Sequence, residues 1–162
     1  MKTKKLTTLA LLTAGAMILS YVESMLPSLG VPGVKMGLAN IAVIFALYRL
    51  GWKEALGISL VRVFVVSMLF GSMSALLYSL AGAALSLGVM ALLKRPDRFS
   101  ETGVSVAGGV AHNAGQILVA MALLGSAKLA YYYPILVISG VAGGVLTGLT
   151  AAMLIKRVPT QK

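Results

Sequence analysis

The sequence contains no cysteine and few other groups that hold metal ions or carry out catalysis. Without cysteine, disulfide bonds and thiolate metal sites are excluded. Asp and Glu together number 4 and there is one histidine, which argues against a structural zinc site. The sequence also has no P-loop motif, so ATP-driven work would need other subunits. We therefore expect no metal ion and no cofactor in this chain.

Charge is scarce as well, and long apolar runs take its place. Charged residues make up 11% of the chain and hydrophobic residues 59%, and the mean hydropathy is +0.94. These values predict a single-domain, all-α integral membrane protein, a six-transmembrane-helix bundle. The expected spans are residues 6–25, 33–50, 55–70, 74–93, 103–124 and 135–155. The second and third apolar runs are short, and the second approaches spanning length only if its helix begins near Gly33, just after Pro32.

The few basic residues indicate the orientation. With a cytoplasmic N-terminus, the inner side receives the clusters at 2–5, 49–53, 94–98 and 156–162, and the outer side receives only Lys35 and Lys128. This distribution follows the positive-inside rule and predicts a multi-pass protein of the cell membrane with both termini in the cytoplasm. The formal charge of +10 is then explained by topology and the lipid bilayer, and we expect no nucleic-acid partner.

The first 20 residues permit a second interpretation, a signal peptide. They have a basic head, an apolar run and the small residues Ala14–Ala16 at a position where cleavage would occur. Cleavage would leave five spans and a basic tail on the outside. Because the apolar run continues through Val22, a first membrane span is favoured.

Small residues mark positions where helices can approach closely. Gly140, Gly144 and Gly148 recur every four residues in the last span, a pattern that favours packing inside the bundle. Ala10 and Ala14 form a similar pair in the first span. That pair is suited equally to internal packing and to docking of another membrane subunit.

The segment GGVAHNAGQILVA, residues 108–120, places polar side chains in the middle of the fifth span. His112 and Gln116 are four residues apart and share a helix face, while Asn113 is rotated by about 100°. One interpretation is hydrogen bonding between helices, and the other is one wall of a ligand site. Tyr78, Ser67 and Ser79 are weaker candidates for the same site.

Arg62 lies near the middle of the third span, where an unpaired charge is costly. One interpretation is an ion pair with Glu23, and the other is that Arg62, supported by Lys35, faces an anionic group of a ligand. Both can hold if Glu23 helps to position the arginine in the empty state. Because these side chains lie at the midplane or in the outer half, we expect an outward-facing site. The expected ligand-binding residues are Glu23, Lys35, Asn40, Arg62, His112, Asn113 and Gln116.

Two outer segments flank this expected site. Residues 26–37 form a loop long enough to fold over the mouth of a bundle. The run Tyr131–Tyr133 before Pro134 is typical of an aromatic belt at the membrane boundary, with a stacking lid as the alternative.

Four blocks resemble a known family in the expected order. They are VPGVKMGLANI (31–41), LFG (69–71), YSLAG (78–82) and GVSVAGGVAHNAGQ (103–116). The chain is similar over nearly its whole length to the heptaprenyl diphosphate synthase component I family, also labelled Gx transporters. That family in turn looks like the substrate-binding S components of energy-coupling factor (ECF) transporters.

The likeness to S components implies a six-helix fold that captures a vitamin or a related small molecule from outside. It implies that the 26–37 loop helps to close the site. It further implies that Ala10 and Ala14 contact an ECF transmembrane subunit, which works together with ATPases.

The synthase name implies different chemistry, which the residues do not support. Known soluble prenyl synthases hold magnesium with aspartate-rich motifs, and this chain has a single aspartate, Asp97. The chain is therefore not expected to be an enzyme. We expect a substrate-binding subunit for a small anionic or amphipathic molecule. The alternatives are a non-catalytic accessory component of isoprenoid or quinone biosynthesis and a structural subunit of a membrane complex.

Overall fold

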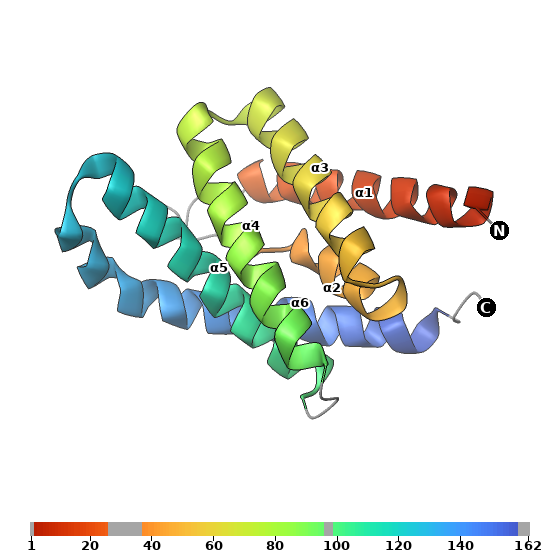
Figure 1. Cartoon of the computed structure of the whole chain (residues 1–162). Helices are drawn as coiled ribbons and strands as arrows, with labels where there is room; N and C mark the ends of the chain where they lie inside the picture. The colour runs from red at the N-terminus through yellow and green to blue at the C-terminus, as the bar shows by residue number, and fades with distance from the viewer. Residues whose placement is uncertain (1, 26–36, 96–98, 159–162) are drawn as a thin grey trace.

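The computed structural model describes residues 2–25, 37–95 and 99–158, and all regular structure in these ranges is helical (Figure 1). The helices are α1 (Lys2–Met25), α2 (Asn40–Arg49), α3 (Trp52–Phe70), α4 (Met73–Lys94), α5 (Glu101–Leu124), the 3₁₀ helix η1 (Ala127–Tyr132) and α6 (Tyr133–Arg157). The predicted all-α fold is confirmed. Lys35 and most of the loop predicted to cover the site lie outside the described residues.

Four helical segments are long and apolar enough to cross a membrane: α1, α4, α5 and η1 together with α6. This indicates a multi-pass membrane protein. The α3 helix has 19 residues but includes Lys53, Glu54 and Arg62, and α2 has only 10 residues. These are the two runs that were short in the sequence.

Gly33, where the second helix would have to begin to reach spanning length, lies outside the described residues. Gly37 has a φ of +72°, which is outside the helical region, and α2 begins at Asn40. Asn40 therefore occupies the first turn of α2, with its backbone N–H bonded to the Gly37 carbonyl oxygen. The chain thus changes direction at Gly37, immediately before the polar side chain of Asn40.

Local signals in the sequence define several helix ends. The Ser72 hydroxyl accepts a hydrogen bond from the Ala75 N–H at the start of α4, and Ser100 does the same for Gly103 at the start of α5. Gly125 ends α5 in the left-handed conformation with a φ of +60°. These caps fix the length and register of the two helices that carry much of the interior polar surface.

Glycine allows α5 and α6 to pack with their backbones in contact. A Cβ added to Gly148 would lie 2.7 Å from the Thr102 Cα, and one added to Gly144 would lie 2.5 Å from the Val106 Cα. Gly140 packs in the same way against Gly109. The prediction that the glycine ridge serves internal packing is therefore confirmed.

The α1 helix lies at the edge of the bundle and leaves most of its apolar surface uncovered (Figure 1). Leu6, Leu11 and Ile18 are each more than 60% exposed, and Ala10 and Ala14 are exposed beside them. The helix is anchored on its other side through the fully buried Ala16. Ala10 and Ala14 thus do not mediate internal packing in the described part of the chain.

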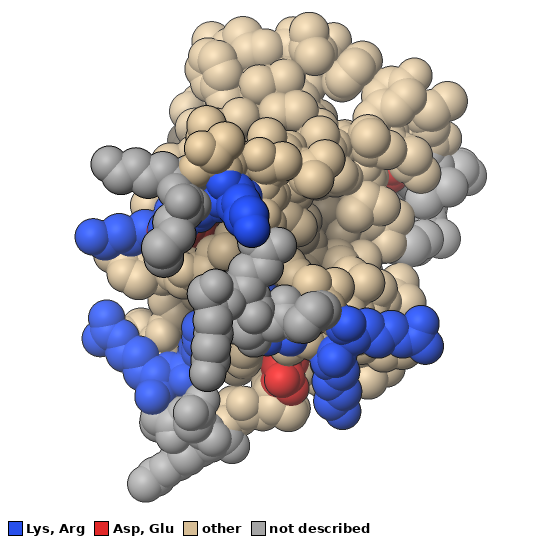
Figure 2. Space-filling model, turned by 90° about the vertical axis from the view of Figure 1, so that its right-hand side faces the viewer, with Lys and Arg blue, Asp and Glu red and all other residues tan. Residues whose placement is uncertain are grey.

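Basic side chains connect the helix ends near the two termini. Arg49 donates hydrogen bonds to the carbonyl oxygens of Ile155 and Val158, and the Lys94 ammonium donates to the Leu47 carbonyl oxygen at 2.6 Å. Figure 2 shows Lys and Arg side chains gathered on the face that carries these ends. The ends of α2, α4 and α6 are therefore tied together at one end of the bundle.

The N-terminal ends of α1 and α3 meet through an ion pair between Lys5 and Glu54. The hydrogen bond that Lys5 donates holds the pKa of the Glu54 carboxyl below its ordinary value. The pair lies at the helix ends, where both side chains retain access to solvent. The ion pair therefore holds the N-terminal ends of α1 and α3 next to each other.

Candidate ligand-binding cavity

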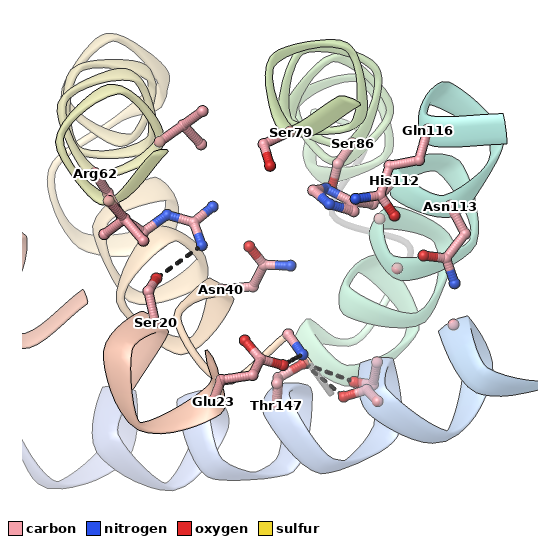
Figure 3. A pocket seen from close by; sticks show the side chains of 18 of the residues that line it. Ser20, Glu23, Asn40, Arg62, Ser79, Ser86, His112, Asn113, Gln116 and Thr147 are labelled. Atoms are coloured by element: carbon pink, nitrogen blue, oxygen red, sulfur yellow. Dashed lines mark hydrogen bonds between the residues drawn. The ribbon is translucent and has the colours of Figure 1, made fainter. Parts of the chain in front are cut away.

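A polar cavity of about 130 Å³ lies among the six α-helices of the described chain (Figure 3). Each predicted ligand-binding residue that the structure describes lines this cavity: Glu23, Asn40, Arg62, His112, Asn113 and Gln116. These residues come from α1, α2, α3 and α5, far apart in the sequence. The fold therefore brings together the polar groups that helical periodicity alone could only place at similar depths.

Arg62 is the buried side chain of the cavity with the most hydrogen-bond donors to satisfy. It is only 9% exposed, and its Nη1 atom donates one hydrogen bond of 3.3 Å, to the Ser20 hydroxyl of α1. The Nε atom is buried and has no acceptor among the described residues. A guanidinium carries five N–H donors, so most of the hydrogen-bonding capacity of Arg62 is unused within the described chain.

Glu23 lies across the cavity from Arg62 but does not pair with it. Its Oε1 atom accepts a hydrogen bond from the backbone N–H of Gly37. In the ranges that the structure describes, no carboxylate oxygen lies within ion-pair distance of Arg62. The predicted direct ion pair between Glu23 and Arg62 is therefore wrong, because the carboxylate is bound by the Gly37 backbone N–H just before α2 begins.

Asn113 behaves as a structural connector between helices. Its amide nitrogen donates to the Leu136 carbonyl oxygen at 2.6 Å and to the Ser139 hydroxyl at 3.3 Å, both on α6. The side chain is buried, with 5% exposure. Of the three polar residues in the central segment of α5, Asn113 thus supports the interpretation of hydrogen bonding between helices.

His112 and Gln116 lie on the adjacent face of α5, as their spacing predicted (Figure 3). The imidazole of His112 fits against Gly82 of α4, where an added Cβ would lie 2.9 Å from Cε1 and Nε2. Gln116 is half-buried, lines the cavity and forms no hydrogen bond with the described residues. On this face of α5, the His112 ring is therefore held by its packing against Gly82, and the Gln116 amide has hydrogen-bonding groups available for a ligand.

The sequence analysis missed most of the hydroxyl groups that line the cavity. Ser67 and Ser79 were weaker candidates, but the lining also contains Ser20, Ser24, Ser86, Ser105, Ser139 and Thr147. Two of these, Ser105 and Thr147, hydrogen-bond to each other at 3.0 Å across the α5–α6 contact. A signal was present in the spacing of Ser79 and Ser86, which are seven residues apart and share a face of α4.

The tyrosine run lies away from the cavity. Tyr131 is 85% exposed and Tyr132 is 53% exposed, and neither they nor Tyr133 line the cavity. Their exposure at the end of the bundle fits an aromatic belt at a membrane boundary and does not fit a stacking lid over this cavity.

The described lining combines one guanidinium, one carboxylate, one imidazole, amides and hydroxyl groups. No group of three or more His, Asp or Glu side chains that could hold a metal ion occurs in residues 2–25, 37–95 and 99–158. The groups are suited to hydrogen bonding and charge recognition of a bound molecule.

Comparison with known proteins links the chain to one family. The family model described as heptaprenyl diphosphate synthase component I matches residues 12–154. The comparison with curated proteins gave no match, and neither did the comparison with solved structures. The matched range includes α2 to α5 completely and most of α1 and α6, and it contains all of the cavity residues named above.

Proposed function

The chain belongs to the heptaprenyl diphosphate synthase component I family, and we propose that it is the substrate-binding membrane subunit of an ECF-like small-molecule transporter. In this role it captures a small vitamin-like, cofactor-like or isoprenoid-related molecule in an outward-facing pocket. The residues that bind are Glu23, Lys35, Asn40, Arg62, His112 and Gln116, with Asn113 holding the wall in place.

The observation that carries this proposal is that Arg62 is buried with few hydrogen bonds to the described protein. Burying a guanidinium in a membrane bundle is expensive, and a structural role would be expected to satisfy its donors within the protein. Arg62 instead has one hydrogen bond, of 3.3 Å, and a buried Nε atom without an acceptor in the described chain. A ligand with an anionic or strongly accepting group would supply the missing acceptors.

The proposed topology has six spans, both termini in the cytoplasm and the cavity open to the outside of the cell membrane. The contacts of Lys94 and Arg49 gather basic helix ends at one end of the bundle, which supports a common cytoplasmic side. Glu23 lies near the C-terminal end of α1 and Asn40 at the N-terminal end of α2, so both lie at the helix ends far from these basic groups. In this topology they lie nearest the external mouth.

The proposed partners are an ECF transmembrane subunit and its ATPases. The exposure of Ala10 and Ala14 within an uncovered apolar helix supports a membrane partner on α1. Small side chains allow a partner helix to approach closely. Such a partner would supply the ATP hydrolysis for which this chain has no motif.

The name of the family favours a second candidate, an accessory membrane component of heptaprenyl diphosphate or isoprenoid quinone biosynthesis. In this candidate the polar cavity would hold the head of an isoprenoid while the tail lies in lipid. Catalysis would belong to another component, since the one aspartate of the chain cannot form an aspartate-rich motif. A third candidate, a structural subunit, predicts that the cavity residues only join helices.

The test is mass spectrometry of the small molecules that remain bound to the purified full chain. The proposal predicts a water-soluble molecule whose amount per folded protein falls strongly in Arg62→Ala and His112→Ala. Arg95→Ala, an exposed arginine outside the cavity, should retain it fully. A bound polyprenyl compound would favour the biosynthetic role, and unchanged retention in both cavity variants together with lower thermal stability would favour the structural role.

A further inference from the structure

The two opposite charges of the cavity are kept apart by the protein. Arg62 on α3 is held by the Ser20 hydroxyl, and Glu23 on α1 is held by the Gly37 N–H (Figure 3). Within the described lining these are the only Arg, Lys, Asp or Glu side chains. Each charge thus faces the same cavity, and neither neutralises the other by direct contact.

Both groups have hydrogen-bonding capacity left for a ligand. The Nε of Arg62 is a buried donor without an acceptor in the described chain. Glu23 receives one backbone hydrogen bond, while a carboxylate has about four acceptor sites. Asn40 and Gln116 add amide groups that form no side-chain hydrogen bond with the described residues. The cavity therefore offers a donor region at Arg62 and an acceptor region at Glu23.

The charges of the cavity side chains restrict the class of ligand that can bind. Apart from the imidazole of His112, the described lining has one basic side chain, Arg62, and one acidic side chain, Glu23. A diphosphate carries at least two negative charges, and in the described part of the lining it would meet the Glu23 carboxylate as well as the one guanidinium, so that like charges would face each other. A ligand with one anionic group and one cationic amine would satisfy both protein charges at once.

From this arrangement we infer that the cavity recognises a small zwitterion, with its carboxylate bound by Arg62 and its ammonium bound by Glu23. The inference rests on the proposed function, because it specifies the substrate class of the same cavity. It commits the cavity to an amino-carboxylic compound. It assigns Glu23 a role in recognition that an anion-only site would not need, since a carboxylate in such a site repels the ligand.

The test measures the thermal unfolding midpoint of the purified full chain with a ladder of probes. Glycine, β-alanine, 4-aminobutyrate and 6-aminohexanoate vary the distance between the two charges. Butyrate lacks the ammonium group, butylamine lacks the carboxylate, and inorganic diphosphate is an anion that has neither. We expect at least one amino acid of the ladder to bind about tenfold more tightly than butyrate or butylamine, because a second charged hydrogen bond is formed.

Two variants test separately the binding of the ligand carboxylate by Arg62 and of the ligand ammonium by Glu23. Arg62→Gln should abolish the preference for every carboxylate probe, and Glu23→Gln should reduce zwitterion binding to the level of butyrate. Arg95→Gln should change neither. Stronger Arg62-dependent binding of butyrate or diphosphate than of any zwitterion would overturn this inference and leave the proposed function intact. Absence of Arg62-dependent binding by every probe would overturn this inference alone as long as the copurified molecule is still lost in Arg62→Ala. Retention of that molecule in Arg62→Ala would overturn the proposed function as well.

Discussion

The imidazole of His112 on α5 lies directly against Gly82 on α4, so closely that a Cβ at residue 82 would lie 2.9 Å from two ring atoms. One wall of the cavity is thus positioned by the absence of a side chain on the neighbouring helix. The contact is specific to this position. Gly88 lies further along the same helix and has nothing within 4 Å of an added Cβ.

Gly82→Ala should therefore displace the His112 ring and weaken ligand retention about tenfold, since a displaced ring loses its hydrogen bond to the bound molecule. The strain should also destabilise the fold by about 1–3 kcal/mol. Gly88→Ala provides the control and should be neutral or slightly stabilising because alanine favours helix. Mass spectrometry of the retained molecule and thermal unfolding measure the two effects. Equal retention in the two variants would contradict a role of the His112 position in binding.

Asn113 and Gln116 should respond in opposite ways to truncation. Asn113→Ala removes the hydrogen bonds to the Leu136 carbonyl oxygen and the Ser139 hydroxyl, and with them the side-chain connection from α5 to α6 at this level. We expect a loss of about 1–2 kcal/mol in stability, with retention per folded protein nearly unchanged. Gln116→Ala should leave stability almost unchanged and reduce retention. The two variants serve as controls for each other, and the reverse pattern would show that their roles have been exchanged.

The contact between α5 and α6 leads to a prediction on stability alone. Gly144→Ala would bring a Cβ to 2.5 Å from the Val106 Cα, a backbone atom that cannot move away on its own. We expect the helices to separate and the free energy of unfolding to fall by about 1–3 kcal/mol. The matched control is Val145→Leu on the exposed side of α6. A thermal unfolding midpoint equal to that of the unchanged protein would mean that α5 and α6 are not in close contact.

The features of the cavity that could be predicted from the sequence are those that depend on residues close together in the chain. The shared face of His112 and Gln116 follows from helix geometry, and the glycine ridge follows from a four-residue spacing, so both were visible in the sequence. The partner of Glu23 was not visible, because a backbone N–H at Gly37 competes with Arg62 and only the fold decides between them. The serine hydroxyls were missed because serine is common between packed membrane helices whether or not they line a cavity.

The start of α2 shows a second limit. The apolar run and Pro32 suggested an earlier helix start, yet the described chain has a positive φ at Gly37 and enters the helix at Asn40. Hydropathy reports which residues are apolar and does not report where the backbone turns. This difference matters for function, because the turn brings the Gly37 N–H to Glu23, and the carboxylate bonds there without forming a direct ion pair with Arg62.

The exposed face of α1 gives the prediction that separates a transporter subunit from an isolated binding protein. Ala10 and Ala14 are exposed next to Leu11, which is 70% exposed. Ala14→Leu should reduce copurification of an energy-coupling transmembrane subunit severalfold, because the larger side chain prevents close helix approach. Ala84→Leu makes the same change at an exposed position of α4 and should leave assembly unchanged. Ligand retention should be equal in the two variants, since neither residue lines the cavity. If Ala14→Leu assembles as well as Ala84→Leu, the partner does not dock on this face of α1.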